Sequence, residues 1–205
     1  MTVKIDFKRN LGCYQAKLDT PQVVEVPDLQ YLMLDGHGDP NTAAFAEAVS
    51  ALYPVAYALK FASRTNLGRD YVVMPLEGLW WADDMEVFTS ARDKAQWEWT
   101  LMIMVPDWIT DGMFAAAADR VGSKARPARL DEVRLQTHSE GLCVQALHIG
   151  SYDDESELLR RMHHEFVPAQ GFTMVGKHHE IYLSDARKVE PGKRRTILRQ
   201  PVTAD

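Results

Sequence analysis

The chain has 205 residues, of which 46% are hydrophobic, enough for the core of one large domain or two small ones. Its formal net charge of -6 and isoelectric point near 5.6 argue against non-specific binding to nucleic acid, so no nucleic-acid partner is expected. The N-terminal residues contain no apolar run typical of a signal peptide, and the apolar segment LMIMV is too short to cross a bilayer. We therefore expect a cytoplasmic protein without a membrane partner.

The first half of the chain contains four segments rich in β-branched, aliphatic and aromatic residues, which favour strands. These strands are expected over residues 22–27, 29–36, 70–83 and 96–106. Apolar residues recur at helical spacing over 38–63, which predicts a helix capped by Asn41 or Thr42. Pro54 lies inside this pattern and should kink or restart the helix.

A second helix is expected over residues 108–124, and the second half of the chain then repeats the order of elements. A helix is expected over 151–170, with Ser151 as its N-cap and acidic residues in its first turn. Strands are expected over residues 132–139, 141–150, 178–187 and 194–202. The first two of these strands could form a hairpin across Glu140 and Gly141.

Each half of the chain thus runs strand, helix, strand, strand. This order predicts an α+β fold in which two pseudo-symmetric units form one antiparallel sheet with helices on one face. We expect a single domain over residues 1–205, with a first half over 20–125 that carries the extra helix and a second half over 126–205. A ligand could bind on the other face of the sheet or in the cleft between the halves.

Several familiar catalytic and cofactor motifs are absent or incomplete. GHGDPN lacks the third glycine of a dinucleotide-binding loop, and no G-x-S-x-G elbow is present. The cysteines, Cys13 and Cys143, lie too far apart for a metal motif, and Cys143 has no basic neighbour and is better explained as a buried thiol. The histidine pairs at 163–164 and 178–179 do not have H-E-x-x-H spacing. We expect neither a metal nor a cofactor.

All five tryptophans lie in one stretch of the chain: Trp80, Trp81, Trp97, Trp99 and Trp108. Two adjacent residues of a strand point to opposite sides, so only one of Trp80 and Trp81 can face a helix-packed core. The other lines the opposite face, where an exposed indole is unfavourable unless it forms the wall of a pocket. Trp97 and Trp99 share one face of their strand, and core packing is the alternative explanation for the whole group.

The segment HHEIYLSD, at residues 178–185, carries an acidic residue in the middle of a predicted strand. In a strand, His178, Glu180 and Tyr182 point to one face, while the alternate residues are suited to a core. If aromatic residues share the face of Glu180, desolvation should raise the pKa of its carboxyl group. Such a carboxyl group could act as a general base or attract a cationic ligand, and the periodicity does not decide between the two.

Longer segments resemble a known family. PLEGLWW, WEWTLMIMVP, EGLCVQALHIGSYDDE and HHEIYLSDARKVEPGKRRTILRQPV are similar to the GyrI-like small-molecule-binding family, in particular to its stand-alone bacterial members. The resemblance implies two strand-helix-strand-strand units related by a pseudo-two-fold axis, with a ligand cleft between them. It also implies a hydrophobic aromatic small molecule as the partner and matches Glu180 to a buried glutamate that meets cationic drugs in relatives.

EGLWW and HHEIYLSD further resemble the cyclopropanoid cyclopropyl hydrolases, which detoxify DNA-alkylating natural products. This resemblance implies Glu180 as a base or water-positioning group and Tyr182 as a hydrogen-bond donor. The ligand-binding residues implied with them are Trp80 or Trp81, Trp97 or Trp99, and, at the mouth of the cleft, Tyr152 and His148. The alternative is a non-catalytic module that sequesters or senses hydrophobic cationic drugs. DNA gyrase is not expected as a partner, and either a monomer or a homodimer is compatible with the chain.

Overall fold

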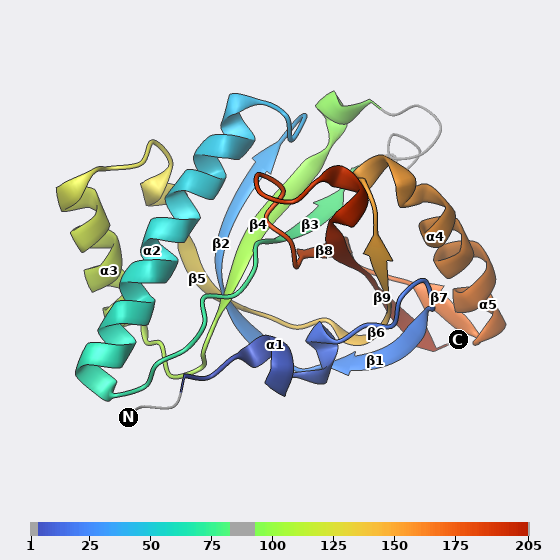
Figure 1. Cartoon of the computed structure of the whole chain (residues 1–205), viewed down its shortest axis with the longest axis horizontal. Helices are drawn as coiled ribbons and strands as arrows, with labels where there is room; N and C mark the ends of the chain where they lie inside the picture. Colours follow the sequence, from blue (N-terminus) through green and yellow to red (C-terminus); the bar gives the residue numbers. More distant parts are fainter. Residues whose placement is uncertain (1–3, 83–92, 205) are drawn as a thin grey trace.

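The computed structural model describes residues 4–82 and 93–204 (Figure 1). The strands are β1 (Gln22–Val26), β2 (Leu29–His37), β3 (Glu77–Trp81), β4 (Glu98–Val105), β5 (Arg134–His138), β6 (Gly141–Ile149), β7 (Phe172–Met174), β8 (His178–Tyr182) and β9 (Arg195–Ala204). The helices are α1 (Phe7–Asn10), α2 (Ala43–Leu67), α3 (Asp111–Lys124), α4 (Ser156–Arg161) and α5 (Val167–Ala169). The end of the strand expected over 70–83, Asp83, lies outside the described residues.

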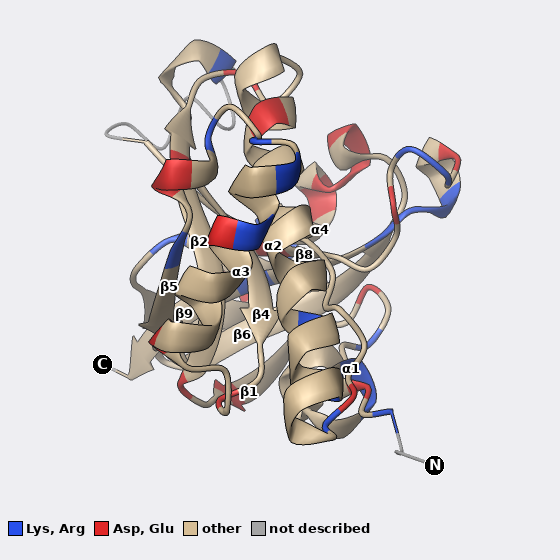
Figure 2. Ribbon diagram, turned by 90° about the vertical axis from the view of Figure 1, so that its left-hand side faces the viewer, with Lys and Arg blue, Asp and Glu red and all other residues tan. Residues whose placement is uncertain are grey.

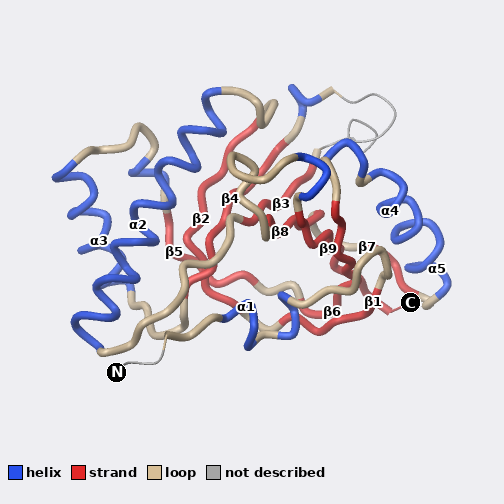
Figure 3. Tube along the Cα trace, viewed as in Figure 1, coloured by secondary structure: helices blue, strands red, loops and turns tan. Residues whose placement is uncertain are grey.

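Within the described residues, nine strands form one sheet in the order β1-β6-β9-β8-β3-β4-β2-β5, and β7 pairs with β9. All of the strand pairs are antiparallel. The α+β fold of two similar units is therefore confirmed: β2-α2-β3-β4 and β6-α4-α5-β8-β9 follow the same order, and they meet where β3 pairs with β8. Figure 3 shows α2 and α3 at one side, α4 and α5 at the other, and the sheet between them.

The predicted hairpin across Glu140 and Gly141 is wrong. β5 pairs with β2 of the first unit, whereas β6 pairs with β1 and β9. Gly141 adopts a left-handed backbone with φ of 66°, at the point where the chain leaves β5 and enters β6. Such a conformation is easy for glycine, and here it directs the two strands to different partners. Each unit therefore receives one edge strand from the chain segment that precedes the other unit.

Helix α2 runs without a restart through Pro54, although the proline cannot donate a hydrogen bond to the preceding turn. Leu52 and Val55, which flank the proline, are both fully buried against the sheet. Burial of this continuous apolar stripe stabilises the helix on both sides of Pro54. Thr42 occupies the expected N-cap position, but its side chain makes no capping hydrogen bond to the helix. The helix ends at Gly68, whose φ of 66° is the usual left-handed cap.

The helix expected over 151–170 is interrupted. Ser151 does form a capping box with Asp154, as its N-cap role predicts. The chain then passes through a 3₁₀ turn and α4 into a π-helical turn, Met162–Phe166, before α5. The pattern of apolar residues does not distinguish a π turn from an α turn, so this interruption has no clear signal in the sequence.

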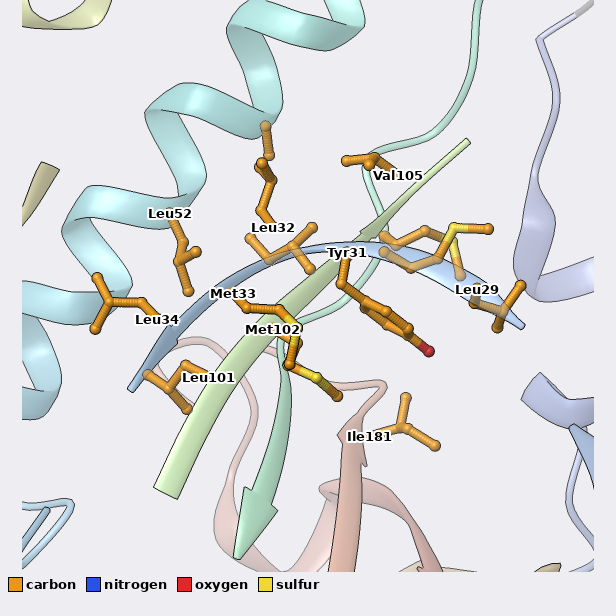
Figure 4. Packing of buried hydrophobic residues seen from close by; sticks show 14 of the residues in the cluster. Leu29, Tyr31, Leu32, Met33, Leu34, Leu52, Leu101, Met102, Val105 and Ile181 are labelled. Atoms are coloured by element: carbon orange, nitrogen blue, oxygen red, sulfur yellow. The ribbon is translucent and has the colours of Figure 1, made fainter. Parts of the chain in front are cut away.

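The two faces of the sheet are covered differently. We call the side that bears α2 and α4 the cleft face and the other side the back face. On the cleft face, Leu34 and Leu101 pack toward Leu52 of α2, and on the back face Tyr31 and Ile181 lie together (Figure 4). The N-terminal segment around Tyr14 covers the back face. The result is a core on both sides of the sheet.

Acidic and basic residues are interspersed along the ribbon on the side of the molecule that bears α2 and α3 (Figure 2). No helix in the described part of the chain combines the length and the apolar character that a bilayer span requires.

Candidate functional site

A cleft with a volume of about 2010 Å³ lies on the cleft face, between α2 and α4 and above β3 and β8. Aromatic and titratable side chains from both units line it, among them Phe45, Trp80, Trp97, Tyr152, Glu155, His163, His178, Glu180 and Tyr182. This volume exceeds that of most sites for drug-sized molecules, and the lining of aromatic rings with a few polar groups is typical of such sites. The cleft is the main candidate for a functional site.

The register of β3 and β8 determines which side chains reach the cleft. Gly78 lies opposite Glu180, and Trp80 lies opposite His178. Because side chains alternate along a strand, these residues and Tyr182 all point to the cleft face. The Glu180 side chain keeps 17% of its surface exposed, so the carboxylate is largely desolvated and still accessible from the cleft.

A chain of hydrogen bonds holds the Glu180 carboxylate in place. The indole N–H of Trp80 donates to the Tyr182 hydroxyl oxygen over 3.0 Å, and the Tyr182 hydroxyl donates to Glu180 Oε2 over 2.7 Å. Burial, together with the neighbouring Glu180, raises the pKa of Tyr182 well above its usual value, so the phenol stays protonated. Tyr182 is therefore a donor to the carboxylate rather than a proton acceptor.

Gly78 provides the space for this arrangement. A Cβ atom at position 78 would lie 2.8 Å from Trp80 Nε1 and 3.2 Å from the Tyr182 hydroxyl oxygen. The first distance is too short for a real side chain, so only glycine fits beside the hydrogen-bonded indole and phenol.

Glu155 is a second carboxyl group in the cleft, and sequence reasoning did not single it out. Its Oε1 atom is buried without a hydrogen-bond partner in the described part of the chain. Burial, followed by repulsion from Glu180, raises the pKa of Glu155 to about 10, although a hydrogen bond from Thr196 opposes the shift. Glu155 is therefore protonated at neutral pH and can donate a proton. Glu155 is the last of three consecutive acidic residues, a pattern that is common at the start of a helix. The sequence therefore gives no sign that this one side chain is buried in the cleft.

Trp80, Trp97 and Tyr152 line the cleft, as the sequence-based hypothesis required. The rings of Trp80 and Trp97 meet edge to face, with centroids 5.7 Å apart. The Tyr152 ring lies 5.8 Å from that of Tyr182, also edge to face. These rings form a wall of the cleft next to Glu180.

Trp81, Trp99 and His148 do not line the cleft. Trp81 points to the back face, where the Lys177 ammonium lies 3.1 Å from the centre of its ring. Trp99 is fully buried and fills the space beside Gly36, where a Cβ atom would lie only 2.1 Å from the indole. His148 is buried, and its Nε2 lies 3.1 Å from the carbonyl oxygen of Ser151 at the start of the 3₁₀ turn. These three side chains therefore pack within the fold and do not contact a ligand in the cleft.

A fully buried ionic network lies behind the cleft, on the back face. The Tyr14 hydroxyl donates to Glu77 over 2.6 Å, and Glu77 Oε2 lies 3.0 Å from His179 Nε2. His179 Nδ1 lies 2.9 Å from Glu140, which accepts a further hydrogen bond of 2.7 Å from Arg199. The side chains of this back-face network are almost completely inaccessible to solvent.

The protonation of the back-face network follows from its contacts. Burial by itself would lower the pKa of His179, but the carboxylate of Glu140 and the hydrogen bonds to both carboxylates raise it overall. Burial would likewise raise the pKa of Glu140, but His179 and Arg199 hold it well below its usual range. The network therefore contains charges of both signs that neutralise one another.

The described residues contain no group of three or more His, Cys, Asp and Glu side chains arranged to hold a metal ion. The antiparallel sheet and the aromatic cleft define the class: an α+β protein with a cleft of the kind that binds small molecules. A family model for the GyrI-like small-molecule-binding domain matches residues 19–202, and the chain belongs to this family.

Solved structures from Listeria innocua are similar over nearly the whole chain. One is an uncharacterized conserved protein with 36% identity and a TM-score of 0.90, covering 98% of this chain and 100% of that one. Another is a hydrolase with 35% identity and a TM-score of 0.88, over the same shares of the two chains. The EcmrR C-terminal domain shares only the fold, at 11% identity and a TM-score of 0.57, covering 91% of this chain and 98% of that domain. No similar sequence was found among curated proteins.

Proposed function

We propose that the protein is a hydrolase that adds water to a strained electrophilic ring of an aromatic small molecule, with a cyclopropane fused to a dienone as its substrate class. The observation that carries this proposal is the pair of carboxyl groups in one cleft: Glu155, whose pKa is raised by burial and by Glu180, and Glu180, which accepts a hydrogen bond from Tyr182. Two carboxyl groups whose environments differ in this way suit paired acid and base catalysis.

The proposed reaction needs one base and one acid. Glu180 takes a proton from a water molecule as the water oxygen bonds to the CH₂ carbon of the cyclopropane. The ring C–C bond breaks, its electron pair moves into the dienone, and the ring becomes aromatic. Glu155 donates its proton to the oxygen of the former dienone, so the product is a phenol that carries one added water. General acid and base groups of this kind contribute roughly 10²–10⁴-fold each.

The aromatic wall would bind the planar body of the substrate. Trp80 and Trp97 present their rings to the cleft beside the carboxyl groups, and rings of this type stack on flat aromatic molecules. Two Listeria structures of a hydrolase, each 35% identical to this chain, support a hydrolytic activity. A role in detoxification within the cytoplasm would follow, since the strained ring alkylates DNA.

Incubation of the protein with a cyclopropanoid compound in ¹⁸O-labelled water tests the proposal. We expect a ring-opened product with one labelled oxygen, detected by mass spectrometry. Glu180→Gln and Glu155→Gln should each lower turnover by roughly 10²-fold or more, because one removes the base and the other the acid. Glu157→Gln is the matched control, since Glu157 is exposed on α4 and pairs with Arg160 outside the chemistry. Equal turnover in all of these variants would reject the proposed roles.

A second candidate function is non-catalytic binding of hydrophobic cations. It is favoured by the position of the Glu180 side chain among aromatic rings, a setting that attracts cations. This candidate predicts saturable quenching of tryptophan fluorescence by a lipophilic cation, with no change in the mass of any cyclopropanoid compound. Formation of the labelled product would exclude it as the sole function.

A further inference from the structure

The π-helical turn Met162–Phe166 interrupts the helical segment beside the cleft. Such turns are rare and frequently occur at functional sites, because the inserted residue changes the direction of the side chains around it. Here the turn carries two adjacent histidines with different surroundings. The His163 side chain is mostly buried and faces His178 of β8, whereas His164 is exposed.

His163 and His178 form a pair of imidazoles on one wall of the cleft. Their ring centroids are 6.0 Å apart, and the rings are nearly perpendicular. Three of their nitrogen atoms, His163 Nε2 and both ring nitrogens of His178, are buried and have no hydrogen-bond partner in the part of the chain that the structure describes. Glu180 Oε1 lies 3.6 Å from His178 Nε2, beyond hydrogen-bonding distance.

Unpaired buried nitrogen atoms are unfavourable in the folded protein unless another molecule supplies partners for them. Both residues line the cleft, so a guest bound there lies beside these imidazoles, whose buried nitrogen atoms have no partner among the described residues. Burial, followed by the neighbouring His178 and His164, lowers the pKa of His163 to about 3, so this imidazole is neutral. A neutral imidazole offers one donor and one acceptor, which complement a neutral group that also has both.

We propose that His163 and His178 form a polar subsite that binds a carboxamide or hydroxyl substituent of an aromatic guest. The ring system of the guest lies against Trp80 and Trp97, and the substituent points toward the π turn. This inference rests on the proposed function in one respect, because it assumes an aromatic guest in the same cleft. It adds a rule of selectivity: a guest with a neutral hydrogen-bonding group is preferred over an equally large guest without one.

Equilibrium dialysis with 2-naphthamide and 2-methylnaphthalene tests the subsite. These probes have a similar planar body, and only the first carries a carboxamide. We expect the wild-type protein to bind 2-naphthamide roughly tenfold more tightly, since an unmet buried hydrogen bond is costly. His163→Leu and His178→Leu should each remove most of this preference without weakening the binding of 2-methylnaphthalene.

Two further variants control for the fold. His163→Gln retains a donor and an acceptor and should keep at least part of the preference. Glu165→Gln changes an exposed residue of the same π turn that pairs with Arg160 and does not line the cleft, and it should leave the preference intact. An equal affinity of the wild-type protein for the two probes, or the same preference in the leucine variants at 163 and 178, would overturn the subsite while leaving an aromatic cleft. Failure of both probes to bind would overturn the subsite together with the aromatic guest of the proposed function.

Discussion

The two faces of strand β8 carry the same kinds of side chain in opposite circumstances. On the back face, His179 is fully buried, and each of its ring nitrogens lies within 3.0 Å of a carboxylate oxygen. On the cleft face, His178 is largely buried but has no hydrogen-bond partner within the described residues, and the same holds for one oxygen of Glu155. Polar groups inside proteins are normally paired, so the unpaired groups that line the cleft are those that a ligand could satisfy.

The carboxyl groups show the same difference. On the back face, Glu140 has a pKa well below its usual range because His179 and Arg199 outweigh the effect of burial. On the cleft face, burial and the nearby Glu180 raise the pKa of Glu155 to about 10. The back-face network therefore stabilises the fold, whereas the cleft retains groups that are poorly stabilised until a guest arrives. This arrangement matches the general observation that functional sites reduce stability.

The largest effect is expected from breaking the back-face network. Arg199→Leu leaves the Glu140 carboxylate buried beside a single partner, and loss of one member of a buried ion pair typically costs about 3–5 kcal/mol. We expect the free energy of unfolding, measured by urea denaturation, to fall by about this amount. Arg195→Leu, at an exposed position of the same strand β9, is the control and should change it little. A loss below about 1 kcal/mol for Arg199→Leu would show that the network contributes little to stability.

Two tyrosines allow the same atom to be deleted on either face. Tyr182→Phe removes the hydroxyl that donates to Glu180, and Tyr14→Phe removes the one that donates to Glu77. We expect Tyr182→Phe to lower kcat about tenfold, because the carboxylate loses its positioning group. Tyr14→Phe should instead lower the free energy of unfolding by about 1–3 kcal/mol and leave kcat nearly unchanged. Measuring kcat and the free energy of unfolding for both variants shows whether one face serves catalysis and the other stability. Equal effects of the two substitutions on kcat would contradict this division.

A smaller effect is expected in the pH dependence of stability. The pKa of His179 is raised in the folded protein. Protonated His179 therefore contributes fully to the free energy of unfolding below the unfolded pKa of about 6.5, and this contribution is lost as pH rises through the folded pKa. The stability difference between the wild type and His179→Gln should therefore shrink at high pH. The change amounts to about 1.4 kcal/mol for each unit by which the pKa is raised. Urea denaturation from pH 6 to pH 10 measures it, and a difference that grows with pH would contradict the assigned proton.

Much of the fold and part of the site follow from local patterns in the sequence. Alternation along 178–183 places Glu180 and Tyr182 on one face, and the order of elements predicts the duplicated units. The choice between Trp80 and Trp81, by contrast, depends on which face the helices cover. That choice is made by contacts between residues far apart in the chain, so local alternation shows only that the two indoles diverge.

Other features depend on pairings that no local pattern contains. Trp99 is buried because Gly36, on the neighbouring strand β2, leaves space for the indole. Glu155 differs from the acids before it only because the helical segment turns it toward Glu180 and Thr196. The partners of β5 and β6 are set by a sheet that spans both units, so two adjacent strands with a short connection do not form a hairpin.

The cleft face reduces the stability of the fold and the back face increases it, and two matched substitutions test this difference directly. The pKa of Glu155 is raised in the folded protein. Burial of Glu155 therefore lowers the free energy of unfolding as pH rises above the unfolded pKa of about 4.5. Glu155→Gln removes this penalty, while Glu140→Gln weakens the contacts with His179 and Arg199.

The decisive measurement is the free energy of unfolding of both variants by urea denaturation at pH 8. We predict that Glu155→Gln raises it by about 1 kcal/mol or more and that Glu140→Gln lowers it by about 3 kcal/mol. A loss of stability in both variants, or a gain in Glu140→Gln, would contradict the assignment of the two faces.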